Sequence, residues 1–232
     1  MPNHLFDQIS ARIPDPAKTF IETLDGRTIS YAGLLEQSAR YANALRGLGV
    51  GVGDRVAVQV EKSPAMLLLY LACVRAGAIF LPLNTAYTVA EIDYFLGDAE
   101  PRLVICDPAR REAIGASAAR HAAAVETLDS SGEGSLFDKA QAASSEFDNA
   151  LRDPDDLAAI LYTSGTTGRS KGAMLSHDNL ASNSLALQDY WRFTSDDVLI
   201  HALPIYHTHG LFVATNVMLF AGGSMIFLPK LD

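Results

Sequence analysis

The sequence of 232 residues is poor in cysteine and in positive charge, and each scarcity argues against a class of protein. Its two cysteines, Cys73 and Cys106, lie in apolar stretches without C-x-x-C spacing, which favours buried free thiols over a disulfide framework. Lysine and arginine total 18 against 27 aspartates and glutamates, a formal net charge of −9. This balance argues against binding to nucleic acid or to anionic membranes, so an anionic ligand requires a local cationic site.

Long uninterrupted hydrophobic runs are also missing. The apolar run at 65–74 is too short to span a bilayer, and the run at 210–228 is broken by polar residues and by Gly222-Gly223. Both runs are typical of a core helix followed by a buried strand. The N-terminal MPNHLFDQIS has no basic flank before an apolar core, so we expect no signal peptide and a cytoplasmic protein.

Apolar periodicity alternates between helix-like and strand-like segments. Residues 31–49 carry Leu34, Tyr41 and Leu45 at helical spacing and end at a glycine, and residues 55–60 then predict a strand. The alternation predicts an α/β fold of layered sheets with packed helices.

Local signals refine the element boundaries. Pro64 predicts a helix start, and Thr88 with Glu91 forms a capping-box pattern. Residues 108–124 predict one helix. The Asp153-Pro154 step is the best candidate for a joint, giving a first subdomain at 1–152 and a second at 153–232.

The segment after the predicted strand at 157–163 carries the most chemistry. It is rich in glycine, serine and threonine, contains Arg169 and Lys171, and has no acid from residue 160 to residue 177. Glycines let backbone N–H groups approach an anion, hydroxyls add donors, and lysine supplies charge. The segment is therefore suited to holding a triphosphate.

This segment has three alternative interpretations. A Walker A loop fails on spacing, because Arg169 and Ser170 separate Gly168 from Lys171. Residues 168–172 match the G-x-S-x-G nucleophile elbow of hydrolases, but an elbow needs a helix after the serine, and a strand-like segment follows here. A solvated turn without function is the third.

Residues 162–172, YTSGTTGRSKG, resemble the signature phosphate loop of adenylate-forming acyl-CoA synthetases. Residues 29–31, 75–84 and 203–210 resemble other core motifs of that family, in the same order. The stretches TTGRSKGAMLSHDNLASNS and LPIYHTHGLF, with Ser170 where many relatives have proline, are most similar to malonyl-CoA synthetases. The resemblance covers the whole chain and implies the N-terminal part of the large domain of such an enzyme.

The resemblance implies an ATP-dependent acyl-CoA ligase, in which a carboxylate and ATP give an acyl-adenylate and coenzyme A then displaces AMP. It implies malonate or methylmalonate as substrate, Mg²⁺ bridging the phosphates and no metal-ligating side chain among the assigned residues. Lys171 and His207 are the expected catalytic residues, His207 beside the acyl pocket. The expected phosphate contacts are Thr163, Ser164, Gly165, Thr166, Thr167, Gly168 and Lys171.

The histidines leave alternatives open. His201, His207 and His209 together suggest a metal site, although no cysteine or glutamate accompanies them in residues 198–232. An ordinary packed histidine is another interpretation of His207. His177 is interpreted either as a helix-start residue or as a functional one.

Other expected family segments are missing from the sequence. It contains neither the Tyr-Gly-x-Thr-Glu pattern nor the Thr-Gly-Asp pattern, and no C-terminal lid with its lysine. We therefore expect the chain alone to be inactive. Two alternatives stay open: a non-catalytic module that binds a nucleotide or a partner, and an adenylating enzyme for a different carboxylate or a carrier-protein thiol.

Overall fold

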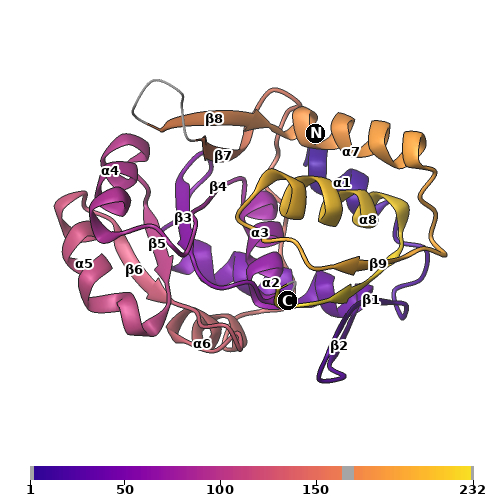
Figure 1. Ribbon diagram of the computed structural model, residues 1–232, viewed down its shortest axis with the longest axis horizontal. Helices are drawn as coiled ribbons and strands as arrows, with labels where there is room; N and C mark the ends of the chain where they lie inside the picture. The colour runs from indigo at the N-terminus through magenta and orange to yellow at the C-terminus, as the bar shows by residue number, and fades with distance from the viewer. Residues whose placement is uncertain (1–2, 164–169, 231–232) are drawn as a thin grey trace.

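The computed structural model describes residues 3–163 and 170–230 and forms two sheets with helices around them (Figure 1). The strands are β1 Thr19–Thr23, β2 Thr28–Ser30, β3 Arg55–Gln59, β4 Ile79–Pro82, β5 Leu103–Cys106, β6 Ala124–Thr127, β7 Leu157–Thr163, β8 Lys171–Ser176, β9 Val198–His201 and β10 Ser224–Phe227. The helices are α1 His4–Ser10, α2 Tyr31–Gly47, α3 Pro64–Ala76, α4 Val89–Ala99, the 3₁₀ helix η1 Pro108–Arg110, α5 Arg111–Arg120, α6 Ser135–Gln141, α7 His177–Trp191, the π-helix η2 His209–Thr215 and α8 Asn216–Ala221.

The larger sheet has the order β6-β5-β3-β4-β7-β8 and is parallel except for β8, which pairs antiparallel with β7. The smaller sheet has the order β2-β1-β10-β9, with β1, β10 and β9 parallel and β2 antiparallel. The predicted layered α/β fold is confirmed. Each sheet contains strands from both sides of residue 153, and the subdomain boundary at 153 stays a prediction.

Helix α3 forms the centre of the core that the two sheets share. Every residue of α3 after Pro64 is buried, because the helix is apolar on all sides. Ser63 caps its first turn, and Gly77 ends it with a φ of 71°, a left-handed conformation that glycine adopts without strain. The ring of Tyr70 packs on Phe80 of the larger sheet and on Phe212 of η2, which joins the two halves of the core.

The capping box at Thr88 and Glu91 is confirmed, as is the helix predicted at 31–49, which ends at Gly47. The single helix predicted over 108–124 is wrong. Helix α5 ends at Arg120, Ala122 adopts a φ of 54°, and residues from Ala124 pair with β5. Backbone pairing with β5 prevails over the helix propensity of the alanines, a tertiary effect that local patterns do not report.

None of the helices in the described ranges is both long enough and apolar enough to cross a membrane. The two apolar runs instead form α3 and the segment of η2, α8 and β10.

Candidate active site

The β7–β8 hairpin brings together the two described ends of the predicted phosphate loop. Thr163 and Lys171 pair directly across the hairpin, and both residues are exposed. The intervening residues Ser164, Gly165, Thr166, Thr167 and Gly168 lie outside the described residues, so their roles stay predictions. The hairpin lies at one edge of the larger sheet, where β8 is the last strand (Figure 1).

The setting of Ser170 contradicts the nucleophile-elbow alternative. Ser170 is followed at once by strand β8, which runs antiparallel to β7. An elbow requires the serine on a sharp turn between a strand and a helix. The serine-hydrolase interpretation is therefore wrong for this motif.

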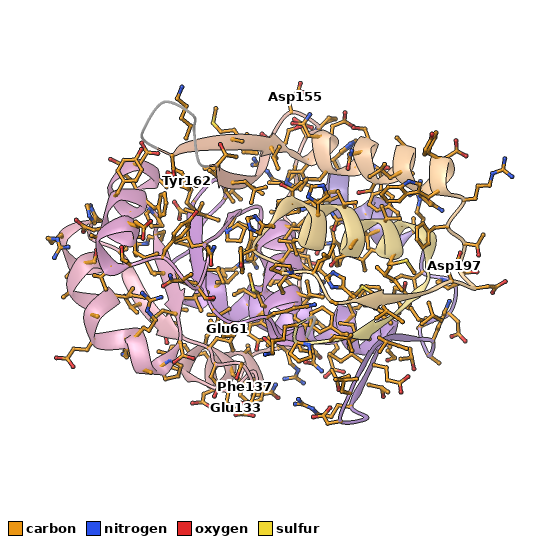
Figure 2. The ribbon with its side chains drawn as sticks, in the orientation of Figure 1. Glu61, Glu133, Phe137, Asp155, Tyr162 and Asp197 are labelled. Atoms are coloured by element: carbon orange, nitrogen blue, oxygen red, sulfur yellow. The ribbon has the colours of Figure 1, made fainter. Side chains whose placement is uncertain are left out.

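Two tyrosine hydroxyls connect helix α4 to the end of the hairpin at which Thr163 and Lys171 pair. The Tyr94 hydroxyl donates to the backbone oxygen of Ser170 at 2.9 Å, and the Tyr162 hydroxyl donates to Oδ2 of Asp98 at 2.5 Å. The ring centroids of Phe95 and Tyr162 lie 4.4 Å apart, and Figure 2 shows Tyr162 under β8, on the side of the hairpin toward α4. Burial, followed by the bond to Asp98, raises the pKa of Tyr162, so its phenol remains a donor.

Folding also changes the electrostatic setting inferred from the sequence. No acid occurs from residue 160 to residue 177, yet Asp98 of α4 accepts a hydrogen bond from Tyr162, the residue before Thr163 in the hairpin. This carboxylate accepts a hydrogen bond from the phenol of Tyr162, while Lys171 at the start of β8 remains exposed. An exposed ammonium beside a threonine hydroxyl matches the needs of a phosphate oxygen.

His207 lies in the connection between β9 and η2, on the smaller sheet's side of the core. The residue is exposed, so the packed-histidine interpretation is wrong for the described structure. With Leu203, Pro204, His209 and Gly210 it lines an open hollow of about 460 Å³. The ring of His207 packs on Tyr206, with 4.7 Å between their centroids. His207 is therefore accessible to a small ligand.

Two other histidines, His177 and His201, are buried. His201 contacts Lys62 and the backbone oxygen of Gly210, and His177 is the first residue of α7, which begins at a capping box. Within the described ranges, no group of three histidines, cysteines or acids is arranged to hold a metal ion. Of the three histidines of residues 201–209, His201 is buried, whereas His207 and His209 line the same exposed hollow.

Residues 8–232 match the family described as "AMP-binding enzyme". The chain belongs to this family.

Solved structures of two states of one AMP-binding enzyme superpose closely on the chain. Apo MatB from Rhodopseudomonas palustris is 64% identical with a TM-score of 0.97, over 100% of this chain and 46% of that one. ATP-bound MatB from the same organism is 65% identical with the same TM-score and the same coverage.

Curated relatives act on different acids. A feruloyl-CoA synthase from an Amycolatopsis species is 36% identical over 214 residues, 89% of this chain and 40% of that protein. A malonate–CoA ligase from Arabidopsis thaliana is 28% identical over 258 residues, 98% of this chain and 42% of that protein. The chain therefore spans less than half the length of these relatives.

The sequence analysis did not identify three residues that lie outside the family motifs and hydrogen-bond to the site segments or to residues near them. Tyr94, Asp98 and Lys62 lie far along the chain from the segments that they contact. The aromatic cluster of Tyr94 and Phe95 in α4 was a usable signal, because aromatic residues enriched on one helix often mark a packed contact.

Proposed function

We propose that this chain is the phosphate-loop portion of an ATP-dependent acyl-CoA ligase. The observation that carries the proposal is the β7–β8 hairpin of an AMP-binding enzyme, which places Thr163 and Lys171 side by side at the two ends of a glycine- and hydroxyl-rich segment. A hydroxyl and an exposed ammonium fit the β- and γ-phosphates of ATP, which offer only acceptors.

The proposed reaction has two steps. A carboxylate oxygen attacks the α-phosphorus of ATP, and the bond to the pyrophosphate oxygen breaks. Lys171 stabilises the negative charge that grows on the departing pyrophosphate, and Thr163 orients it with a hydrogen bond. The thiol of coenzyme A then attacks the acyl carbon, and AMP leaves.

The proposal assigns the acyl side of the reaction to His207. Its exposed ring at the hollow of Leu203 and Gly210 can donate a hydrogen bond to a carboxylate or an acyl-adenylate oxygen. A Mg²⁺ ion held by the phosphate oxygens would neutralise part of their charge.

Malonate is the carboxylate that we propose, with methylmalonate as a close analogue. The support is the malonate–CoA ligase among the curated relatives, together with the resemblance of the TTGRSKGAMLSHDNLASNS and LPIYHTHGLF stretches to malonyl-CoA synthetases. The feruloyl-CoA synthase at 36% identity defines the competing substrate class, a larger aromatic acid.

Carboxylate-dependent exchange of labelled pyrophosphate into ATP tests the proposal, because it reports the first step alone. The full-length protein that contains this chain is assayed with malonate, methylmalonate, acetate and benzoate. We expect malonate to support the fastest exchange. Preference for benzoate would end the malonate assignment and keep the ligase, whereas no exchange with any carboxylate would overturn the ligase itself.

A further inference from the structure

A buried polar network lies below the segment that carries His207. Lys62, in the connection from β3 to α3, places its Nζ 3.0 Å from Nδ1 of His201 and donates to the His201 backbone oxygen at 2.7 Å. On the other side of the ring, Nε2 of His201 is 2.8 Å from the backbone oxygen of Gly210. Thr215 of η2 donates to the same oxygen at 2.9 Å. Lys62 and Gly210 are thus linked through one imidazole.

The partners determine which ring nitrogen carries the proton. A lysine amino group that donates to Nδ1 requires a lone pair there, so Nδ1 of His201 is the acceptor. The backbone oxygen of Gly210 can only accept, so Nε2 carries the hydrogen. His201 is therefore neutral, in the Nε2–H form.

The surroundings keep the ring neutral. His201 is 1% exposed and is faced by Lys62, by the ring of Phe227 from β10 at 5.2 Å, and by Thr215 and the Gly210 oxygen from η2. Burial, followed by the charge of Lys62, lowers the pKa of His201 to about 4. Burial also lowers the pKa of Lys62 to about 7. The neutral amine can donate or accept, so the Gly210 oxygen, which can only accept, is the partner that keeps the hydrogen on Nε2 in both protonation states of the lysine.

The network acts on a tightly folded connection. A Cβ placed on Gly210 would lie 2.1 Å from the backbone oxygen of Pro204, so only glycine allows these two backbone segments to approach. His207 lies between them in the sequence, and its own backbone oxygen accepts from the N–H of Leu211 at 3.0 Å. Holding the Gly210 carbonyl therefore constrains the backbone on which His207 stands.

We propose that His201, held as the Nε2–H tautomer between the Gly210 carbonyl and Lys62, is a positioning residue that holds the His207 connection in its active geometry. The proposal rests on the proposed ligase function and adds two residues that do not line the hollow beside His207. His201 acts through the Gly210 carbonyl, and Lys62 acts through His201.

The tautomer is tested first, because it requires no activity. Nitrogen-15 NMR of histidine-labelled full-length protein, with His201 identified by its loss in His201→Gln, should show a protonated Nε2 and an unprotonated Nδ1 from pH 8 to pH 5. A ring protonated at Nδ1, or doubly protonated at pH 6, would overturn the proposal. This result stands apart from the ligase assignment.

Positioning is then tested with paired substitutions. His201→Leu keeps bulk and removes the donor, whereas His201→Gln keeps an N–H near the Nε2 position. We expect His201→Leu to lower the turnover number of malonate-dependent exchange at least about tenfold per folded molecule, with little change in the KM for ATP, and His201→Gln to recover most of it. Equal loss in both variants, or loss explained by unfolding alone, would contradict a positioning role.

His177→Leu is the matched control, because His177 is also fully buried but neither of its ring nitrogens has a hydrogen-bond partner in the described structure. It should leave exchange per folded molecule unchanged. A loss there equal to that of His201→Leu would show that removing any buried histidine suffices, and would overturn the proposal. If wild-type protein shows no exchange with any carboxylate, the ligase function fails, and the NMR result still decides the tautomer.

Discussion

The β7–β8 hairpin and the His207 connection both present exposed side chains for the proposed reaction, but they are supported differently. The hairpin stands at the open edge of the larger sheet and is tied to α4 by two tyrosine hydroxyls. The His207 connection rests on the buried network of Lys62, His201 and Thr215. The hairpin is thus held by hydrogen bonds near the protein surface, whereas the His207 connection is held by hydrogen bonds to buried side chains.

Because of this difference, we expect substitutions in the hairpin to change activity alone, and substitutions under His207 to change both activity and stability. Exposed groups contribute little to folding, since water already satisfies them, so the hairpin can change its charge without unfolding the domain. Buried polar groups cost several times more when they lose a partner, so changes under His207 affect folding as well as geometry. Three substitutions test this contrast.

The largest effect is expected from Lys171→Ala in the full-length protein. Adenylation with malonate should fall by roughly 10²- to 10³-fold, the usual loss for one preorganised group that stabilises developing charge. Because Lys171 is exposed, the melting temperature should stay within about 1–2 °C of wild type. Pyrophosphate exchange and a thermal melt measure the two effects.

Lys139→Ala is the control for charge removal, since Lys139 is a surface lysine on α6 that pairs with Glu126. It should leave exchange unchanged. Normal exchange in Lys171→Ala would show that the role given to this lysine is wrong.

The next effect is expected from Gly210→Ala. The added methyl would collide with the Pro204 backbone oxygen, which belongs to main chain and has little room to move. We expect a loss of roughly 2–4 kcal/mol in the free energy of unfolding, measured by denaturant titration, together with weaker exchange.

Gly115→Ala provides the opposite case. Gly115 lies within α5, and a Cβ there meets nothing within 4 Å. Alanine should therefore stabilise the protein by roughly 0.5–1 kcal/mol, because it lowers the entropy of the unfolded chain. Equal changes in the free energy of unfolding for Gly210→Ala and Gly115→Ala would contradict the close approach of Gly210 to Pro204.

The smallest effect is expected from Tyr94→Phe. The substitution keeps the ring packing and removes the bond to the Ser170 oxygen, which is worth about 1 kcal/mol. Exchange should fall less than about tenfold, mainly through a raised KM for ATP. Tyr190→Phe, at a side chain that is 82% exposed on α7, should change neither constant. An unaltered KM for ATP in Tyr94→Phe would show that the hydroxyl of Tyr94 does not help to position the hairpin for ATP.

Much of this architecture could be predicted from short stretches of sequence. The helix from Tyr31, the capping box at Thr88 and the strand ending at Thr163 each depend on residues within a few positions of one another. The hairpin setting of the phosphate loop followed for the same reason, because a strand-like pattern flanks it on each side. The assignments of Thr163 and Lys171 to phosphate remain predictions.

Tertiary structure alone decided the rest. Ile21 of β1 pairs with Met225 of β10, Tyr94 bonds to Ser170, and Lys62 bonds to His201, each across a separation that no local pattern spans. Strand β6 formed against the helix propensity of Ala124 because β5 offered an unpaired edge. By itself the sequence determined periodicity, caps and the composition of the loop, which are local. Only tertiary folding determined the pairing of buried donors with acceptors, since a hydrogen bond depends on distance in space and not along the chain.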